Sequence, residues 1–238
     1  MTSAPSRLLS ARAQEFISSV LRLSPRIAVF DCDDTFWMGD MGAAFFYWEI
    51  EQGLIPKQIA DWALPRYDDY KAGRVDEETM CGEMVTIHSG IPEEKIVPAA
   101  QQFFDAVVQE RIFPEMQQLT RRLAGAGCQL WAVSSTNEWL IRAAVPHFSI
   151  SPDRVLAASV QVEDGCATDR LIRVPTDEGK AAALREFIGD KIDAAFGNSI
   201  HDAAMLEMAR HPFAINPNPD LAAIAGQKGW TIYQPDPF

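Results

Sequence analysis

No stretch of this 238-residue sequence is long and apolar enough for a membrane-spanning helix. Basic residues are also few, since 21 Lys and Arg stand against 33 Asp and Glu, for a formal charge of −12. Nucleic acids and anionic membranes are bound through an excess of Lys and Arg, so this balance argues against both as partners. The negative net charge does not exclude an anionic small-molecule ligand, because such a ligand needs only a few local hydrogen-bond donors.

Cysteine is scarce, with four residues that form neither a CxxC pair nor a metal-type spacing. A reducing, cytoplasmic setting fits this pattern best. The first 23 residues lack the continuous apolar core of a secretory signal. Their apolar residues recur at helical spacing, which predicts an amphipathic helix packed on the domain, with a transit peptide as the alternative. The residues concerned are Leu8, Leu9, Phe16, Ile17, Val20 and Leu21.

Short apolar runs alternate with helical patterns along most of the chain. This alternation is typical of an α/β protein, in which helices cover both faces of a mostly parallel sheet. We expect strands at 27–30, 129–133, 155–162, 194–196, 213–215 and 231–233. We expect helices at 115–126, 138–145, 178–188, 202–210 and 220–228.

Residues 37–112 differ from the rest, because they are rich in aromatics and contain no convincing strand. Gly and Pro predict breaks at 53–56, at Gly73 and at 90–92. We therefore expect a helical cap domain at 37–112, inserted into a core domain made of residues 1–36 and 113–238. Such an insertion lies outside the carboxyl ends of the strands, where open α/β folds bind ligands.

Four groups of polar residues follow expected strands or begin an expected helix. Each has an ordinary explanation by itself: a turn, a helix cap or a solvated position. Their joint occurrence favours a functional site over four separate coincidences. The groups are Asp31, Asp33 and Thr35; Ser134 and Ser135; Lys180; and Asn198 with Asp202.

Together these residues resemble the four motifs of the haloacid dehalogenase superfamily of phosphohydrolases, in the same order along the chain. The DxDxT motif matches at Asp31, Asp33 and Thr35. The stretches FPEMQQLTRRLAGAG, VEDGCATDRL and FAINPNPDLAAIAGQKGW are similar to the phosphoserine-phosphatase-like branch, which carries a helical cap. The resemblance covers nearly the whole chain beyond the first 25 residues. It implies a Rossmann-like core with an inserted helical cap.

The resemblance also implies roles for these residues. Asp31 is expected to attack phosphorus and form an aspartyl-phosphate, which is a form of covalent catalysis. Asp33 is expected to protonate the leaving group and then to activate water. The phosphate oxygens would be held by Ser134, the main-chain N–H of Ser135 and the Lys180 ammonium.

A Mg²⁺ ion is the implied cofactor. Its ligands would be the Asp31 carboxylate, the Asp33 main-chain carbonyl, and Asn198 or Asp202. The first polar position of the fourth motif is commonly an acid in this family, whereas this chain has Asn198, whose amide can ligate but brings no charge. We expect Asp34 to be solvated or to cap a turn. His201 either contacts the substrate or phosphate, or has a structural or exposed role.

These assignments predict a Mg²⁺-dependent phosphomonoester hydrolase for a small phosphorylated metabolite. The alternatives are phosphotransfer through the same intermediate and a non-catalytic protein that binds phosphorylated ligands. Dehalogenation is not expected, because it does not use Asp33 or the metal cluster. The natural substrate and the oligomeric state stay open.

Asp40 is the candidate for substrate selection. Phosphoserine phosphatases have an acid nine residues after the nucleophile that holds the substrate ammonium, and Asp40 has this spacing from Asp31. Nearby aromatic residues could add cation–π contacts. Arg66 and Arg74 are candidates for a substrate carboxylate. In the alternative, the aromatics form the core of the cap, Asp40 caps a helix, and both arginines are solvated.

Overall fold

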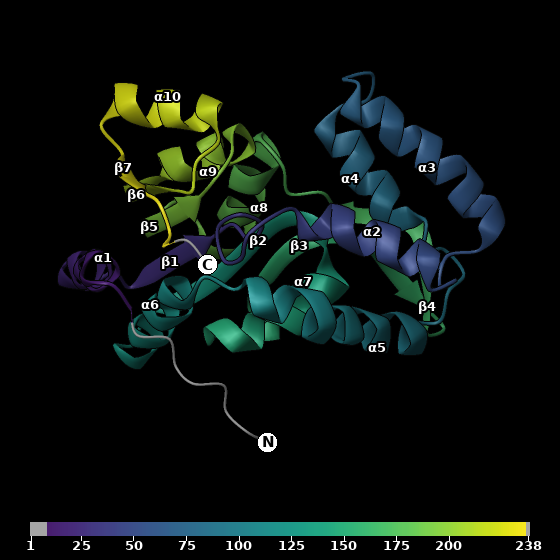
Figure 1. The fold of residues 1–238 in the computed structure, drawn as a ribbon, viewed down its shortest axis with the longest axis horizontal. Coiled ribbons are helices and arrows are strands. Elements are labelled where there is room, and N and C mark those ends of the chain that lie inside the picture. Colours follow the sequence, from purple (N-terminus) through teal and green to yellow (C-terminus); the bar gives the residue numbers. More distant parts are fainter. Residues whose placement is uncertain (1–8, 237–238) are drawn as a thin grey trace.

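The computed structural model describes residues 9–236, and Leu8 lies outside this range. The predicted N-terminal helix is present as α1, Ala11–Arg22, and Ser10 caps it. Phe16 on its apolar face stacks on Tyr233 with the ring centroids 3.8 Å apart. The amphipathic helix is therefore confirmed, and it ties the start of the described chain to its end (Figure 1).

The core is a seven-stranded sheet in the order β4-β3-β2-β1-β5-β6-β7. All neighbouring strands are parallel except β3 and β4, which form an antiparallel hairpin. The α/β class with a mostly parallel, Rossmann-like sheet is confirmed, and β1 occupies its centre. The strands are β1 Ile27–Phe30, β2 Gln129–Asn137, β3 Val155–Glu163, β4 Cys166–Arg173, β5 Ile192–Gly197, β6 Ala209–Ile215 and β7 Thr231–Tyr233.

Helices cover both faces of the sheet, because alternate residues of a strand point to opposite sides. On one face Phe30 stacks on Phe196, which stacks on Phe213. On the other face Val29 packs in a second buried cluster with Leu184. Figure 1 shows α6 and α7 on one side of the sheet and α8, α9 and α10 on the other. These helices are α6 Pro114–Gly125, α7 Glu138–Ala144, α8 Glu178–Ile188, α9 Ala203–Met208 and α10 Pro219–Lys228.

Most predicted boundaries shift by one or two residues, and the largest differences lie at the end of β2 and where α9 meets β6. Strand β2 continues to Asn137, so the polar stretch after position 133 lies in the strand rather than beyond it. The helix predicted at 202–210 is wrong at its end, because α9 stops at Met208 and β6 begins at Ala209. Pro212 explains the second difference, since proline disfavours helical backbone at the residue before it. The stretch VEDGCATDRL contains the tight turn between β3 and β4, with Asp164 and Gly165 both at positive φ, as in a type I′ turn.

Four α-helices lie within residues 37–112, and their joins fall at the predicted breaks. Trp37 and Ile112 form an isolated β-bridge where this segment leaves the core and returns to it. One buried hydrophobic cluster runs from the sheet into these helices. That 37–112 is a separate cap domain therefore stays a proposal. The helices are α2 Met41–Glu51, α3 Lys57–Lys71, α4 Glu77–Thr86 and α5 Glu93–Phe103, followed by a π-helical turn at Phe104–Val108 and a 3-10 turn at Gln109–Arg111.

Candidate active site

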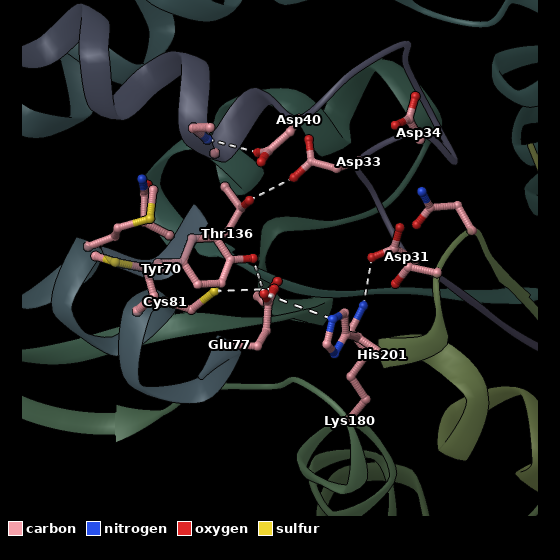
Figure 2. A pocket seen from close by; sticks show the side chains of 18 of the residues that line it. Asp31, Asp33, Asp34, Asp40, Tyr70, Glu77, Cys81, Thr136, Lys180 and His201 are labelled. Carbon is pink, nitrogen blue, oxygen red and sulfur yellow. Dashed lines mark hydrogen bonds and ion pairs between the residues drawn. The ribbon is translucent and has the colours of Figure 1, made fainter. Parts of the chain in front are cut away.

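A pocket of about 190 Å³ lies where the carboxyl ends of β1, β2 and β5 face α2, α3 and α4 (Figure 2). The sheet contributes Asp31, Asp33 and Ser135 to its lining, and the loop after β5 contributes Asn198. The helices contribute Asp40 and other residues described below. The polar groups predicted at separate strand ends are thus brought to one edge of the sheet.

Asp31 lies at the end of the central strand and is 5% exposed. Its Oδ2 accepts a hydrogen bond from Thr35 Oγ1 at 3.0 Å, and its Oδ1 accepts one from Lys180 Nζ at 2.6 Å. Burial and the charge of Asp202 raise the pKa of Asp31 to about 7, although Lys180 opposes the rise. The carboxylate is therefore fixed in position and only partly neutralised by its surroundings.

Lys180 enters the same site from α8 and is buried. Its ammonium donates to Asp31 Oδ1 and to Asp202 Oδ1, each at 2.6 Å, and to the carbonyl of Val133 at 3.2 Å. Burial by itself would lower the pKa of Lys180, but the two carboxylates outweigh it and raise the pKa. One ammonium thus serves two carboxylates and uses all three of its hydrogens.

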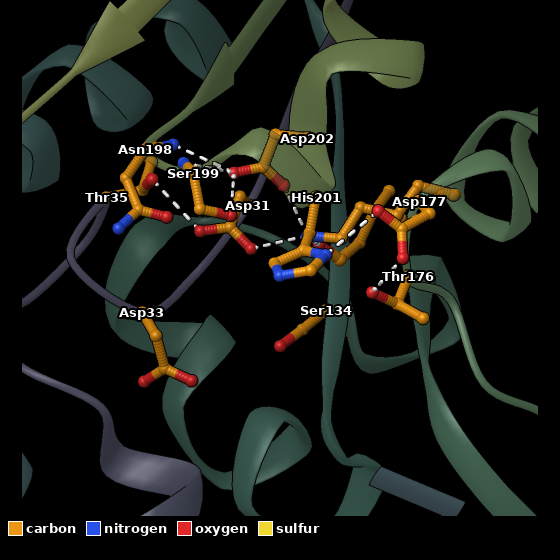
Figure 3. Close-up of polar contacts among 12 residues, drawn as sticks. Asp31, Asp33, Thr35, Ser134, Thr176, Asp177, Asn198, Ser199, His201 and Asp202 are labelled. Carbon is orange, nitrogen blue, oxygen red and sulfur yellow. Dashed lines mark hydrogen bonds and ion pairs between the residues drawn. The ribbon is translucent and has the colours of Figure 1, made fainter. Parts of the chain in front are cut away.

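Asp202 is fully buried, and both of its oxygens have partners (Figure 3). Oδ1 receives Lys180, and Oδ2 accepts the main-chain N–H groups of Asn198 and Ser199 at 2.9 and 3.0 Å. A Cβ at Gly197 would lie 2.6 Å from the Cβ of Asp202, so only glycine fits there. Asp202 therefore fixes the loop after β5, and its oxygens are already occupied.

The side chain of Asn198 lines the pocket and makes no hydrogen bond within residues 9–236. Its amide oxygen, the Asp31 carboxylate and the Asp33 carbonyl are all oxygen ligands of the kind that Mg²⁺ prefers. In the part of the chain that is described, no three His, Cys, Asp or Glu side chains group as a metal cluster. A cation here would therefore depend on one carboxylate together with amide and carbonyl oxygens.

Asp33 is held in a different environment from Asp31. Its Oδ1 accepts the indole N–H of Trp37 at 2.7 Å and the main-chain N–H of Met41 at 2.8 Å. Its Oδ2 accepts the Thr136 hydroxyl at 2.7 Å. Burial raises the pKa of Asp33, and these three hydrogen bonds oppose the rise. Thr136, to which sequence reasoning gave no role, connects β2 to this carboxylate.

Asp34 and the serines occupy supporting positions. Asp34 has a φ of 53° and accepts the main-chain N–H of Gly39 at 2.8 Å, so it caps the turn as expected. Ser134 is buried, and its Oγ accepts the main-chain N–H of Thr136 at 3.2 Å. Ser135 lines the pocket beside it. Ser134 itself is not among the residues that line the pocket.

Asp40 lines the pocket and also caps α2. Its Oδ1 accepts the main-chain N–H of Ala43 at 2.8 Å. The capping alternative is therefore confirmed, and it does not remove Asp40 from the pocket. Oδ2 has no hydrogen-bond partner within residues 9–236 and stays available to a ligand.

Arg66 and Arg74 are not among the residues that line the pocket. The Arg66 guanidinium pairs with Glu83 on α4, with Nε 2.8 Å from Oε2. Arg74 pairs with Asp69, with Nη2 2.6 Å from Oδ1. The structure thus brings Asp40 to the site but not the two arginines that were candidates for a substrate carboxylate.

Glu77 is a pocket residue that sequence reasoning missed. It lies in the first turn of α4 and accepts a hydrogen bond from the Tyr70 hydroxyl. Its Oε2 is 4.0 Å from Nε2 of His201, whose Nδ1 is 2.9 Å from Asp177 Oδ1. In the sequence, Glu77 follows Asp76 and resembles an ordinary acidic helix start. Asp76 does cap α4, so nothing local distinguished Glu77 from a solvated neighbour.

Comparisons with known proteins agree with this geometry. The family model for haloacid dehalogenase-like hydrolases matches residues 28–207. A histidinol-phosphatase of Neisseria meningitidis serogroup C (strain 8013) is 24% identical over 217 residues, which are 87% of this chain and 97% of that protein. The family match includes the strand ends that build the pocket.

Two solved structures share the fold. A protein of unknown function from Bordetella pertussis Tohama I has a TM-score of 0.76 and 22% identity, covering 87% of this chain and 97% of its own. A probable phosphoserine phosphatase from Vibrio cholerae has a TM-score of 0.63 and 15% identity, covering 95% of this chain and 69% of its own. With the family match across more than half of its length, the chain belongs to the haloacid dehalogenase-like hydrolases.

Proposed function

We propose that the protein is a Mg²⁺-dependent phosphomonoester hydrolase that acts on a small phosphorylated metabolite through an aspartyl-phosphate. The observation that carries this proposal is the contrast between Asp31 and Asp33. Asp31 contacts an ammonium and one hydroxyl, whereas Asp33 is held by three uncharged donors. Two neighbouring carboxylates with such different surroundings suit two different roles, a nucleophile and an acid–base.

In this reaction an oxygen of Asp31 attacks phosphorus and the bond from phosphorus to the ester oxygen breaks. Asp33 gives its proton to the leaving alkoxide, which departs as an alcohol. Asp33 then takes a proton from a water molecule, whose oxygen attacks the phosphorus of the aspartyl-phosphate. The Asp31 carboxylate is regenerated and inorganic phosphate leaves. Ser134, the N–H of Ser135 and Lys180 would hold the phosphate oxygens during both steps.

The residues at the pocket fit a Mg²⁺ ion through oxygen ligands. Asp31, the amide oxygen of Asn198 and the main-chain carbonyl of Asp33 would hold it. When bound, the ion would neutralise charge on the phosphate oxygens and on the carboxylates. Asp202 is better suited to ordering the loop of Asn198 than to ligating the ion, because both of its oxygens have partners.

The size and lining of the pocket suggest the kind of substrate. A volume of about 190 Å³ suits a small ester. Asp40 has a free carboxylate oxygen there, and Tyr67 and Tyr70 line the same space. Carboxylates and aromatic rings together bind cationic groups well. The relative named as a histidinol-phosphatase supports an amino alcohol phosphate as substrate.

Phosphate release from p-nitrophenyl phosphate, measured with Mg²⁺ and again with EDTA, tests the function. Mg²⁺-dependent release is expected, followed by faster turnover of amine-bearing phosphates than of neutral esters of the same size. Binding of phosphorylated ligands without release under any condition would contradict hydrolysis and support the non-catalytic alternative.

For the cellular setting we propose the cytoplasm. All four cysteines are free, which fits a reducing compartment. Within residues 9–236, every helix is too short or too polar to cross a membrane.

A further inference from the structure

Most charged side chains that line the pocket are negative. Five carboxylates line it, and within the described chain Lys180 is the only Lys or Arg among its lining residues. The three hydrogens of that ammonium already point to Asp31, Asp202 and Val133. Away from the reaction centre, Asp40 and Glu77 also line the pocket, to which no Lys or Arg of residues 9–236 other than Lys180 contributes.

The nearby basic side chains already have acidic partners. Arg66 is bound to Glu83 through two nitrogens, and Arg74 is bound to Asp69. The His201 ring lies between two carboxylates, Asp177 at 2.9 Å and Glu77 at 4.0 Å. None of these side chains is free to receive a carboxylate from a ligand.

Glu77 itself is held firmly in place. It is 16% exposed, the Tyr70 hydroxyl donates to Oε2, and the Cys81 thiol lies 3.6 Å from Oε1. Figure 2 shows Tyr70, Cys81 and His201 around this carboxylate. Because its position is fixed, Glu77 cannot turn away when a second negative charge enters, and repulsion in a partly dehydrated pocket is strong.

We propose that Glu77 is a specificity-determining residue that rejects substrates bearing a carboxylate, so that the site accepts phosphate esters of small amines that lack one. The inference rests on the proposed phosphatase function and names its substrate class. It adds a repulsive element to the attraction that Asp40 offers to an amine. Selection between close analogues commonly uses both elements.

Phosphoethanolamine and phosphoserine provide a matched test, because they differ only by one carboxylate. For the wild type we expect kcat/KM to be at least about tenfold higher for phosphoethanolamine. Glu77→Gln removes the charge and keeps an acceptor for Tyr70. It should raise kcat/KM for phosphoserine about tenfold, without a rise for phosphoethanolamine.

Glu78→Gln is the matched control, since Glu78 is exposed one residue further along α4 and does not line the pocket. It should leave both values unchanged. Binding of the same two esters to the Asp31→Asn variant, measured by calorimetry with Mg²⁺, gives a second readout that needs no turnover. There we expect phosphoethanolamine to bind more tightly.

The outcomes separate the inference from the function on which it rests. If phosphoserine is used or bound as well as phosphoethanolamine by the protein with Glu77 intact, the inference is overturned. It is also overturned if Glu77→Gln changes the ratio of the two substrates no more than Glu78→Gln does. Selective binding of phosphoethanolamine without hydrolysis would support the inference while contradicting the proposed function.

Discussion

Asp31 and Asp33 are two residues apart, yet they face different partners. An ammonium and a hydroxyl hold Asp31, whereas an indole, an amide and a hydroxyl hold Asp33. Neither carboxylate hydrogen-bonds the other, although both line the same pocket. Substitutions at single residues should therefore separate the roles of the two carboxylates.

Asp31→Asn should leave the protein folded but lower kcat by at least about 10³-fold, because it would remove the attacking group of the proposed mechanism. Phosphate release from p-nitrophenyl phosphate measures the loss, and circular dichroism checks the fold. Asp34→Asn is the control, since asparagine tolerates the positive φ of that turn and should retain activity. Substantial turnover by pure Asp31→Asn would rule out the aspartyl-phosphate.

Thr136→Val removes one of three hydrogen bonds to Asp33 without changing the size of the side chain. We expect turnover to fall about tenfold for alkyl phosphates and less for p-nitrophenyl phosphate, because proton donation matters most for a poor leaving group. Rates for a series of esters with leaving groups of different acidity measure this. An equal loss across the series would show that Thr136 does not act through Asp33.

Asn198→Asp adds a negative charge beside Asp31 without lengthening the side chain. If Asn198 ligates Mg²⁺, the variant should bind the ion several-fold more tightly. The Mg²⁺ concentration that gives half-maximal activity measures this, and calorimetry with Mg²⁺ alone provides an independent value. An unchanged affinity would place Asn198 away from the ion.

At the scale of elements, a buried Glu–His pair connects α2 to the residues that follow α4. Nε2 of His88, which follows α4, lies 2.8 Å from Oε2 of Glu49 on α2, and both side chains are inaccessible to solvent. Burial by itself would lower the pKa of His88, but Glu49 outweighs it and raises the pKa. Burial raises the pKa of Glu49, although His88 opposes the rise. The stability of this part of the fold should therefore depend on pH.

The direction in which stability changes with pH follows from the raised pKa of His88. Its stabilisation is fully present below the unfolded-state pKa of about 6.5 and is lost as pH rises through the folded-state value. The free energy of unfolding should therefore fall as pH rises above about 6.5, as urea titrations would measure. Glu49→Gln should flatten this dependence. Glu51→Gln, exposed at the end of the same helix, should not.

Elements whose residues repeat a clear pattern were predictable from the sequence. Strand β1 and helix α8 have the predicted bounds, because an apolar run and a helical spacing define them. The end of β2 was not predictable, since its last residues are polar and resemble a loop. The β6 boundary was also missed, because the apolar spacing of α9 continues into a strand that has Pro212 in its interior.

For the molecule as a whole, the sequence predicted the pocket residues at the carboxyl ends of the strands. It did not predict those on α3 and α4, which face them across the pocket. Side chains after parallel strands converge by topology, so Asp31, Ser135 and Asn198 were predictable as neighbours. The pocket residues on α3 and α4 were not, because helical spacing does not say which side of a helix faces a ligand. The partners of Arg66 and the position of Glu77 depend on how those helices pack.

The contacts of Lys180 also matter for assembly. Asp31 and Asp202 come together when β1 pairs with β5, but their charges are compensated only when α8 brings Lys180 between them. Two like charges buried without their cation are strongly unfavourable. A partly folded state in which the sheet has formed but α8 has not yet packed on it is therefore unfavourable. Docking of α8 should therefore complete the core and the charge balance of the pocket in a single cooperative event.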